Sequence, residues 1–316
     1  GASGSRVVVE EYLTGHSPLT VSSYRDSCKN HIKPFLGRYR LDAITPVLVQ
    51  KFVNKMLAQG LAAKTVKKIH GVLHRALQQA VLIGYLRTNP ADVCNLPKAR
   101  RAPVKPLSDE QIAALMNALD QSGHPYADLY IVTLFTGMRQ GEVLGLGWED
   151  VDFRSGTILV HRQLRRLKER GAGYDYAEPK DHASRVIKPA PSVMTLLKRH
   201  RIHQSELQLA AGPAWSNPMN LVFTNELGGH LVHGTVYRQF KRIIAELGFP
   251  DFRFHDLRHT YAVVSLENGD DIKTVQENLG HATAAFTLDV YGHVNERMRK
   301  ESSDRMEKFI HQVSTL

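Results

Sequence analysis

A ten-residue segment rich in proline and charge, PKARRAPVKP from Pro97 to Pro106, constrains the fold of this chain more than any other feature. Three prolines among four cations disfavour the interior of a helix or sheet and favour an exposed linker. A chain of 316 residues is long enough for two domains with separate cores. We therefore predict a first domain over residues 6–96, a linker over 97–106 and a second domain from residue 107.

Apolar residues recur at helical spacing throughout the first domain. The segments 18–33, 46–59 and 62–86 each show this pattern, which predicts a small helical bundle. Asn89 and Pro90 follow the third segment and are expected to stop its helix.

The formal net charge of +10 lies entirely in the first hundred residues. Residues 1–100 contain 15 Lys and Arg against 5 Asp and Glu, whereas the remaining residues carry 26 of each sign. A basic module of this kind is typical of proteins that bind nucleic-acid phosphates with strong salt dependence. Ordinary solubilising charge is the alternative. The candidate DNA-binding residues lie in the third helical segment: Lys64, Lys67, Lys68, His74 and Arg75.

The second domain is predicted to be mainly α with a small antiparallel β-sheet. Ser108 and Gln111 form a capping box at the start of its first helix. Residues 125–147 contain a mainly apolar helix that breaks near TGMRQGE. Residues 151–191 favour strands, with a turn at residues 155–156.

The sequence also bears on the cellular compartment. Cys28 and Cys94 are too few for a disulfide framework and are expected to be buried thiols in a reducing cytoplasm. No apolar run approaches the roughly 20 residues needed to span a bilayer, and no signal peptide is present. Residues 1–5, GASGS, are typical of an expression-vector remnant, which leaves room for native residues upstream.

The last third of the chain carries side chains that few chemistries require together. His255 and Arg258 lie in HDLRH, His281 in LGH and Tyr291 in LDVYGHV, all within 37 residues. Two of these, His255 and Arg258, are expected to bear cations. A further cation, Arg139, lies upstream in TGMRQGEVLGL.

This set of side chains indicates phosphoryl transfer to a tyrosine. With an unperturbed pKa of about 10, a tyrosine hydroxyl is a poor nucleophile at neutral pH. Arginines around it would stabilise the developing oxyanion and hold a phosphate, whose oxygens a guanidinium contacts two at a time. A site without metal needs several fixed cations, which Arg139 and Arg258 supply. Glu142 stands three residues after Arg139 and could orient its guanidinium on a helix.

Together these motifs resemble the tyrosine recombinase (phage integrase) family, and in detail the integrases of conjugative transposons and prophages. The likeness extends from about residue 7 to about residue 310. Lys180, in EPKDHASRVIKPA, falls where the family has its hairpin lysine. The family's six catalytic positions fall on Arg139, Lys180, His255, Arg258, His281 and Tyr291.

The resemblance implies a two-domain C-clamp, with a helical core-binding domain over 6–96 and an α+β catalytic domain over 107–294. It implies a site-specific DNA recombinase of a mobile element that acts through a 3′-phosphotyrosine and a Holliday junction, without metal, ATP or another cofactor. The implied partners are double-stranded DNA at the element ends and target site, further copies in a tetramer on two duplexes, and accessory DNA-bending or directionality factors. The tail over 295–316 is expected to dock on a neighbouring protomer. The implied location is the bacterial cytoplasm, at the nucleoid.

Other functions stay open on the sequence. A type IB topoisomerase resembles the recombinases in its catalytic residues, and a non-catalytic DNA-binding protein would account for the basic first domain. His255 and His259 stand at i, i+4 and could bind a metal, as in the HExxH hydrolases, although Asp256 replaces the glutamate and no third ligand is obvious. Among the tyrosines, Tyr261 is the nearest rival of Tyr291 as the nucleophile.

The candidates also have plainer structural alternatives. Lys180 could be a solvated turn lysine, and His281 could cap a helix without chemistry. Arg258 could pair with Asp256 or Glu267. Because all of these residues match motifs of the family, we favour the functional roles.

Overall fold

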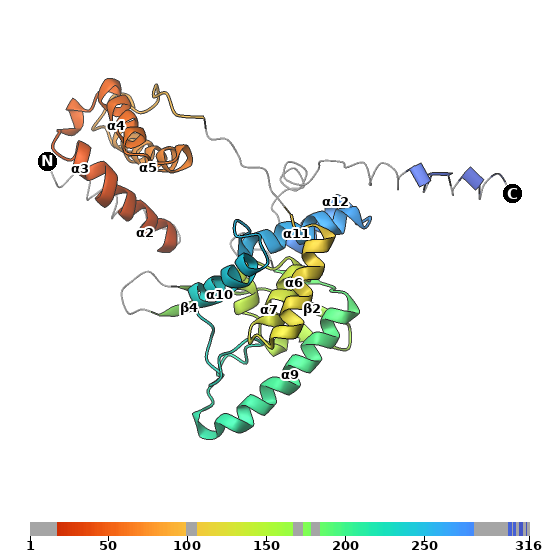
Figure 1. The fold of residues 1–316 in the computed structure, drawn as a ribbon. Coiled ribbons are helices and arrows are strands. Elements are labelled where there is room, and N and C mark those ends of the chain that lie inside the picture. The colour runs from red at the N-terminus through yellow and green to blue at the C-terminus, as the bar shows by residue number, and fades with distance from the viewer. Residues whose placement is uncertain are drawn as a thin grey trace. The chain divides into compact units, whose positions relative to one another are not determined.

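The chain divides into two compact units, which are described separately (Figure 1). The computed structural model describes residues 18–98, 106–166, 173–177 and 184–280, and seven residues within 303–314. Residues 18–98 belong to the first unit and the described residues from 106 onward to the second. The expected remnant at 1–5 and most of the expected linker lie outside the described residues. No helix in the described part is long and apolar enough to cross a membrane.

The first unit is a helical bundle, as predicted. Its buried core is built from apolar side chains of α4 and α5, and Phe52 packs its ring 5.5 Å from that of Phe35. Thr45 caps α4 by accepting a hydrogen bond from the backbone N–H of Leu48. The helices are α2 (Pro18–Ser27), α3 (Lys33–Leu36), α4 (Pro46–Ala58) and α5 (Ala63–Leu82), with a π-helical turn over Cys28–Ile32.

The last long helix of this unit ends earlier than predicted. Helix α5 stops at Leu82 rather than near Asn89 and Pro90. Gly84 adopts φ +81°, and the backbone N–H of Tyr85 donates to the carbonyl of Ala80 at 2.8 Å. A glycine in the left-handed region is a strong helix stop, so it acts before the proline does.

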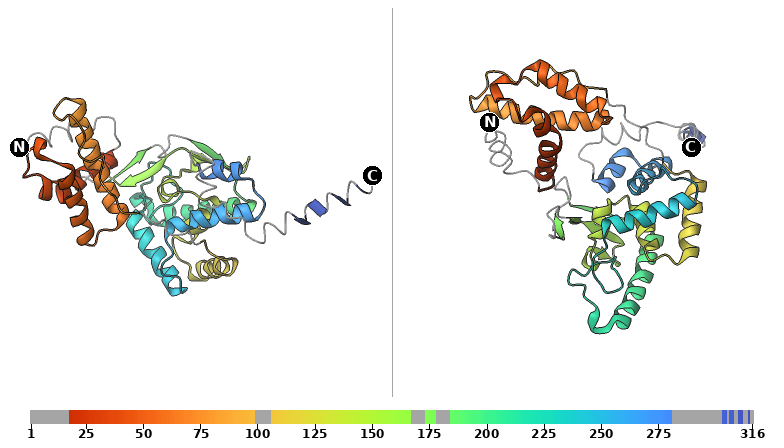
Figure 2. Two further views of the ribbon diagram at one scale, coloured as in Figure 1. Left: turned by 90° about the horizontal axis from the view of Figure 1, so that it is seen from above. Right: turned by 60° about the vertical axis from the view of Figure 1, so that its left-hand side comes forward.

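Most of the second unit is helical, and its capping box is confirmed. Ser108 Oγ accepts from the N–H of Gln111, and Gln111 Oε1 accepts from the N–H of Ser108. The C-terminal half of α9 extends past the other helices of this unit (Figures 1 and 2). The helices are α6 (Asp109–Ser122), α7 (Ala127–Thr136), α8 (Gln140–Leu144), α9 (Pro191–Ala211), α10 (His233–Glu246), α11 (Phe254–Glu267) and α12 (Ile272–Leu279).

The predicted antiparallel strands are present, but they form two small sheets rather than one. The three-stranded sheet has the order β1-β2-β5, and the second sheet is the hairpin β3-β4. In the larger sheet Val160 of β2 pairs with Arg185 of β5. The predicted turn between β1 and β2 is confirmed, with Gly156 at φ +70°. The strands are β1 (Val151–Asp152), β2 (Thr157–Val160), β3 (Gln163–Arg166), β4 (Tyr174–Ala177) and β5 (Arg185–Ile187).

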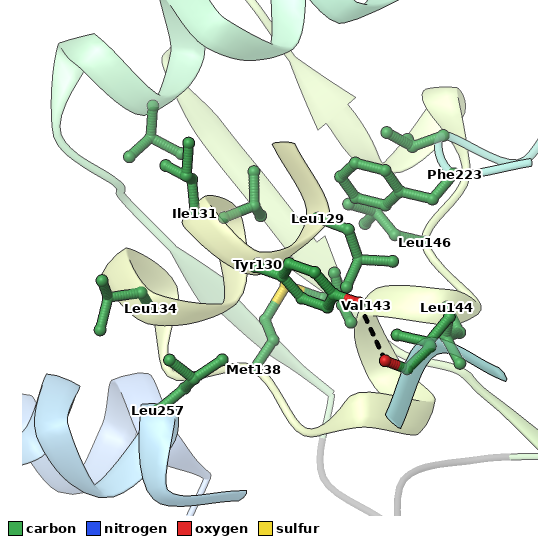
Figure 3. Packing of buried hydrophobic residues seen from close by; sticks show 14 of the residues in the cluster. Leu129, Tyr130, Ile131, Leu134, Met138, Val143, Leu144, Leu146, Phe223 and Leu257 are labelled. Carbon is green, nitrogen blue, oxygen red and sulfur yellow. Dashed lines mark hydrogen bonds between the residues drawn. The ribbon is translucent and has the colours of Figure 1, made fainter. Parts of the chain in front are cut away.

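Helix α7 runs through the core of the second unit, with seven of its ten residues buried. Tyr130 lies within this core, and its hydroxyl donates to the carbonyl of Val236 at 2.9 Å (Figure 3). Its ring packs against those of Phe240 and Phe254, at 5.2 Å and 6.0 Å between centroids. Because Phe254 begins α11, this packing joins α7 to α11. Arg258 lies on α11, and Arg139 follows the end of α7 by three residues.

Candidate active site

Arg139 directly precedes α8, as its N-cap residue, and is tied to Glu142. Its backbone N–H donates to Glu142 Oε2 at 2.9 Å, and its Nη1 donates to Glu142 Oε1 at 2.8 Å. The Glu142 side chain is fully buried, whereas that of Arg139 is 22% exposed. The predicted pairing is confirmed, and it leaves part of the Arg139 side chain accessible to a ligand.

A second arginine, Arg185, binds the same carboxylate and was missed by the sequence analysis. Its Nη1 and Nη2 donate to Oε1 and Oε2 of Glu142 at 3.1 Å and 2.6 Å. Its Nε donates to the carbonyl of Asn278 at 2.7 Å. The available signal was strand alternation, because Arg185 and the apolar Ile187 must share one face of β5.

Glu142 is ionised despite its burial. Desolvation raises the pKa of this carboxyl, but the hydrogen bonds and charge of Arg185, followed by the charge and backbone N–H of Arg139, outweigh that effect. The net result is a pKa of about 2. The carboxylate therefore accepts four hydrogen bonds from two arginines and balances only one of their charges.

Arg258 is the most deeply buried of the candidate cations, with 2% of its surface exposed. Its Nη1 donates to the carbonyl of Gly137 at 2.7 Å, and its Nη2 donates to the carbonyl of Leu279. These carbonyls lie at the C-terminal ends of α7 and α12, where the partial negative charge of a helix stabilises a cation. The carboxylate of Asp256 binds Arg253, with Nη2 to Oδ1 at 2.6 Å.

Gly137 lies where a side chain would collide. It has φ +65°, and a Cβ there would meet Tyr261 Cδ1 at 2.5 Å and Leu279 Cδ2 at 2.7 Å. Gly123 is a matched control, because it ends α6 at φ +56° with nothing within 4 Å of its Cβ position.

We expect Gly137→Ala to lower the free energy of unfolding by about 1–3 kcal/mol more than Gly123→Ala does. Both variants strain a left-handed residue, by about 1–2 kcal/mol, but only the first also overpacks the core. Urea unfolding of the two variants measures the difference. Equal losses would contradict the close packing around Gly137.

The C-terminal end of α12 gathers the arginines. Three consecutive carbonyls, of Asn278, Leu279 and Gly280, accept from Arg185, Arg258 and Arg139 respectively, the last at 3.3 Å. Gly280 ends the helix in the left-handed region, at φ +64°. The glycine that ends α12 therefore lies beside the arginine cluster.

Three of the six family positions lie outside the described residues: Lys180, His281 and Tyr291. The structure brings together the other three, Arg139, His255 and Arg258, with Glu142. His281 directly follows Gly280 in the chain, and Arg185 lies five residues after Lys180.

His255 is not the cation that the sequence analysis expected. It lies on α11, is exposed to solvent, and is next to the ring of His259 at 4.9 Å between centroids. Partial desolvation, then the charges of His259, Arg258 and Arg139, lower its pKa to about 4. At neutral pH its ring is therefore uncharged and can both donate and accept a hydrogen bond.

We expect acid to destabilise the second unit in two successive windows, which overlap slightly near pH 4. Through His255, stability falls as the pH drops from about 6.5, the unfolded pKa, to about 4, because the unfolded chain binds the proton more readily. Glu142 loses its contribution at lower pH, between about 4.5 and about 2. His259, His124 and His233, whose pKa values are also lowered by desolvation, add to the upper window.

Thermal unfolding of His255→Asn across this pH range tests the assignment. The decline in the upper window should become shallower, with a remainder from His124, His233 and His259, while the lower window stays the same. An unaltered upper window would contradict it.

Tyr261 is a partly buried residue and a poor nucleophile. It packs with the apolar cluster of α11 and α12, and its hydroxyl accepts a hydrogen bond from Asn278 Nδ2 at 3.1 Å. Desolvation raises its pKa, despite hydrogen bonds to Ser265 and Asn278 that lower it. These contacts favour a packing role for Tyr261 over that of the nucleophile.

The described residues contain no group of three or more His, Cys, Asp or Glu side chains that could hold a metal ion. His255 and His259 face each other edge to face, at an interplanar angle of 87°. The pair suggested by sequence spacing therefore lacks a third ligand among the residues that the structure describes.

The candidate DNA-binding residues all lie on α5. Lys64, Lys67 and Lys68 are exposed along one side of the helix. His74 Nε2 is 2.8 Å from Asp92 Oδ1, and Arg75 Nη1 donates to the hydroxyl of Tyr24 at 3.1 Å, so both side chains also have partners within the first unit.

Two family models match this chain. The model described as the phage integrase family matches residues 105–298, and the model described as the phage integrase N-terminal SAM-like domain matches residues 9–57. The first match includes every candidate catalytic position from Arg139 to Tyr291.

Curated proteins and solved structures match along most of the chain. A tyrosine recombinase XerC-like protein of Caldanaerobacter subterraneus subsp. tengcongensis is 32% identical over 305 residues, covering 92% of this chain and 78% of the relative. The ICEBs1 integrase of Bacillus subtilis is 26% identical over 324 residues, covering 93% of this chain and 83% of the relative.

Two solved structures are also similar. The Tn1549 transposon integrase, solved in complex with transposon right end DNA, has a TM-score of 0.81 at 20% identity, covering 96% of this chain and 99% of the solved chain. A lambda integrase tetramer bound to a Holliday junction has a TM-score of 0.68 at 20% identity, covering 89% of this chain and 77% of the solved chain.

The solved structures share the mainly α fold with small antiparallel sheets. The family model spans more than half of the chain, and the XerC-like relative is similar along nearly all of it. This chain therefore belongs to the phage integrase family, and it is a tyrosine-type site-specific recombinase.

Proposed function

We propose that the recombinase cuts and rejoins DNA through a covalent bond between Tyr291 and a 3′ phosphate. The tyrosine oxygen attacks the phosphorus, the bond to the 5′ oxygen breaks, and that oxygen takes a proton and leaves as a 5′-hydroxyl. The 5′-hydroxyl of a partner strand then attacks the phosphotyrosine and releases Tyr291. Recombination takes two such strand exchanges, and the Holliday junction is the intermediate between them. Each cleavage is matched by one ligation, so ATP is not consumed.

The observation that carries this proposal is the balance of charge at the end of α12. Arg139, Arg185 and Arg258 converge on three consecutive carbonyls, and Glu142 balances one of the three charges. Fixed cations in a partly buried site stabilise the charge that develops on phosphate oxygens in phosphoryl transfer. The arrangement favours binding of an anion over the accessible edge of Arg139.

Each family position has a role in this proposal. Arg139 contacts the phosphate, and the buried Arg258 supplies a second fixed charge that stabilises the pentacoordinate state. Lys180 protonates the leaving 5′ oxygen. His255 and His281 donate hydrogen bonds or relay protons, and the neutral state of His255 suits that role. The negative charge of a bound phosphate would raise the pKa of His255.

The two units divide the work on DNA. Residues 6–96 grip the duplex through the α5 side chains, mostly at the backbone, which positions without specifying. Residues 107–294 hold the scissile phosphate, and residues 97–106 link the two as a clamp. The basic charge of the first hundred residues supports this division.

The biological setting follows from the relatives. Integrases of the mobile elements ICEBs1 and Tn1549 are among the similar proteins, and lambda integrase forms a tetramer on a Holliday junction. By this likeness the chain acts as a tetramer on two duplexes, element ends and target site, aided by DNA-bending or directionality factors. Its location would be the bacterial cytoplasm, at the nucleoid.

The tail over residues 295–316 is assigned to assembly. Met306 and Ile310 lie four residues apart on helical residues and are 60% and 46% exposed. Such a pair is suited to docking on another protomer, because it leaves apolar surface in water.

We expect Met306→Glu with Ile310→Glu to reduce the yield of the two-duplex complex while single-duplex binding persists. Glu307→Gln, at a polar position between them, is the control. Gel shift and light scattering measure both steps. A tetramer yield equal to that of the unaltered chain would refute the docking role.

A trapping experiment tests the function without knowledge of the DNA site. The chain is incubated, in excess chelator, with nicked duplexes whose sequence around the nick is randomised. Cleavage beside the nick releases a short fragment and traps the protein on DNA. A protein band carrying covalent DNA on a denaturing gel is expected, and sequencing of the trapped DNA gives a substrate for later assays. Binding without any trapped adduct would overturn the proposal.

A further inference from the structure

Arg185 occupies a central position in the second unit that no step of the proposed chemistry uses. It is the first residue of β5, and its side chain is only 7% exposed, against 22% for Arg139. All three of its guanidinium nitrogens donate hydrogen bonds, two to Glu142 and one to the carbonyl of Asn278. Few groups remain on this guanidinium to contact DNA directly.

The carboxylate of Glu142 is shared symmetrically between the two arginines. Oε1 accepts from Nη1 of Arg139 and Nη1 of Arg185, and Oε2 accepts from the backbone N–H of Arg139 and Nη2 of Arg185. A buried carboxylate paired with Arg139 alone would cancel its charge and weaken its attraction for a phosphate. With Arg185 bound as well, the three groups together keep one net positive charge.

The stem of Arg185 also packs against the end of α12. A Cβ at Gly280 would lie 3.0 Å from Arg185 Cδ and 3.1 Å from its Nη1. Gly280 in turn presents its carbonyl to Nη2 of Arg139 at 3.3 Å. Arg185 therefore contacts two of the elements that determine where Arg139 lies, namely Glu142 and the left-handed turn that precedes His281.

We propose that Arg185 is a positioning residue for recombination. It neutralises Glu142, so that the charge of Arg139 remains available to the scissile phosphate. It also joins three segments: β5, which begins five residues after Lys180 in the chain, the start of α8, and the end of α12. This inference rests on the proposed function.

The test uses the nicked duplex recovered in the trapping experiment and measures the rate of covalent adduct formation. Arg185→Met is expected to slow this rate about 100-fold, comparable to the loss of one transition-state donor, with binding of the uncleaved duplex retained. Arg185→Lys keeps the positive charge but loses the forked guanidinium, so its rate should lie between those of the unaltered chain and Arg185→Met.

Adding Glu142→Gln to Arg185→Met is expected to recover about tenfold of the lost rate, because it removes the carboxylate that then cancels Arg139. If Arg185 had only a structural role, the double variant should form the adduct more slowly than Arg185→Met, because it has lost a further hydrogen-bonding partner of Arg139. The control is Arg162→Met, which removes another largely buried arginine, paired with Glu149 at 2.7 Å outside the site. It should lower the melting temperature and leave the rate per folded molecule unchanged.

The outcomes separate the inference from the proposed function. If the unaltered chain forms the adduct and Arg185→Met forms it equally fast, the inference alone fails. A double variant slower than Arg185→Met also overturns it. If Arg185→Met does not fold, Arg185→Gln replaces it, and the comparison of Arg185→Gln with Arg185→Gln plus Glu142→Gln decides by the same sign. If the unaltered chain forms no adduct with any duplex, the proposed function fails, and the inference falls with it.

Discussion

Exchanging Arg258 for methionine is expected to lower the rate of DNA cleavage by about 10³-fold or more, the upper range for loss of a fixed donor in a charge-stabilising site. Arg258 is 2% exposed and donates to the carbonyls of Gly137 and Leu279. Methionine replaces the apolar stem but is shorter and has no donor, so both buried carbonyls lose a partner. Each such loss costs about 1–3 kcal/mol, and the second unit should therefore also unfold at lower urea concentration.

Arg253→Met is the matched control for Arg258→Met. Arg253 lies at the start of the same helix and bonds to Asp256, but its side chain is 61% exposed. Its partner Asp256 is buried, with a side chain 9% exposed, but keeps the backbone N–H of Arg253 as a hydrogen-bond donor, so the change should cost about 1 kcal/mol of stability. Cleavage should therefore continue near the rate of the unaltered chain. If Arg258→Met cleaved as fast as Arg253→Met, the buried arginine would have no part in catalysis.

Replacing Tyr291 by phenylalanine is expected to abolish the covalent adduct while DNA binding continues. The change removes a single oxygen, and that oxygen is the proposed nucleophile. Tyr261→Phe is the control, because it removes a hydroxyl that accepts from Asn278. It should lower the free energy of unfolding by about 1 kcal/mol and leave the adduct intact. If Tyr291→Phe still formed the adduct and Tyr261→Phe did not, Tyr261 would be the nucleophile instead of Tyr291.

Local patterns in the sequence were enough to predict much of this fold. The helical spacing in residues 46–59 gave α4 to within one residue, and the capping box at Ser108 is present as expected. The three-residue step from Arg139 to Glu142 correctly indicated their ion pair. These features depend on residues close together in the chain, where spacing alone fixes the geometry.

The features that sequence could not supply depend on contacts between distant segments. Arg185 meets Glu142 across 43 positions, and a lone charged residue in a strand carries no sign of its partner. The neutral state of His255 depends on how strongly its ring is desolvated, which spacing does not reveal. Whether five short strands form one sheet or two is likewise decided by tertiary pairing.

The most direct test of the central claim is to locate the amino acid that carries the DNA. The trapped adduct is digested with nuclease and trypsin, and the modified peptide is sequenced by mass spectrometry. Cleavage after Lys273 and Arg297 yields a peptide whose one tyrosine is Tyr291, while Tyr261 falls in the preceding peptide, from residue 259 to 273. We predict a nucleotide remnant joined through its 3′ phosphate to Tyr291. A remnant on Tyr261, or on any serine or histidine, would contradict the account.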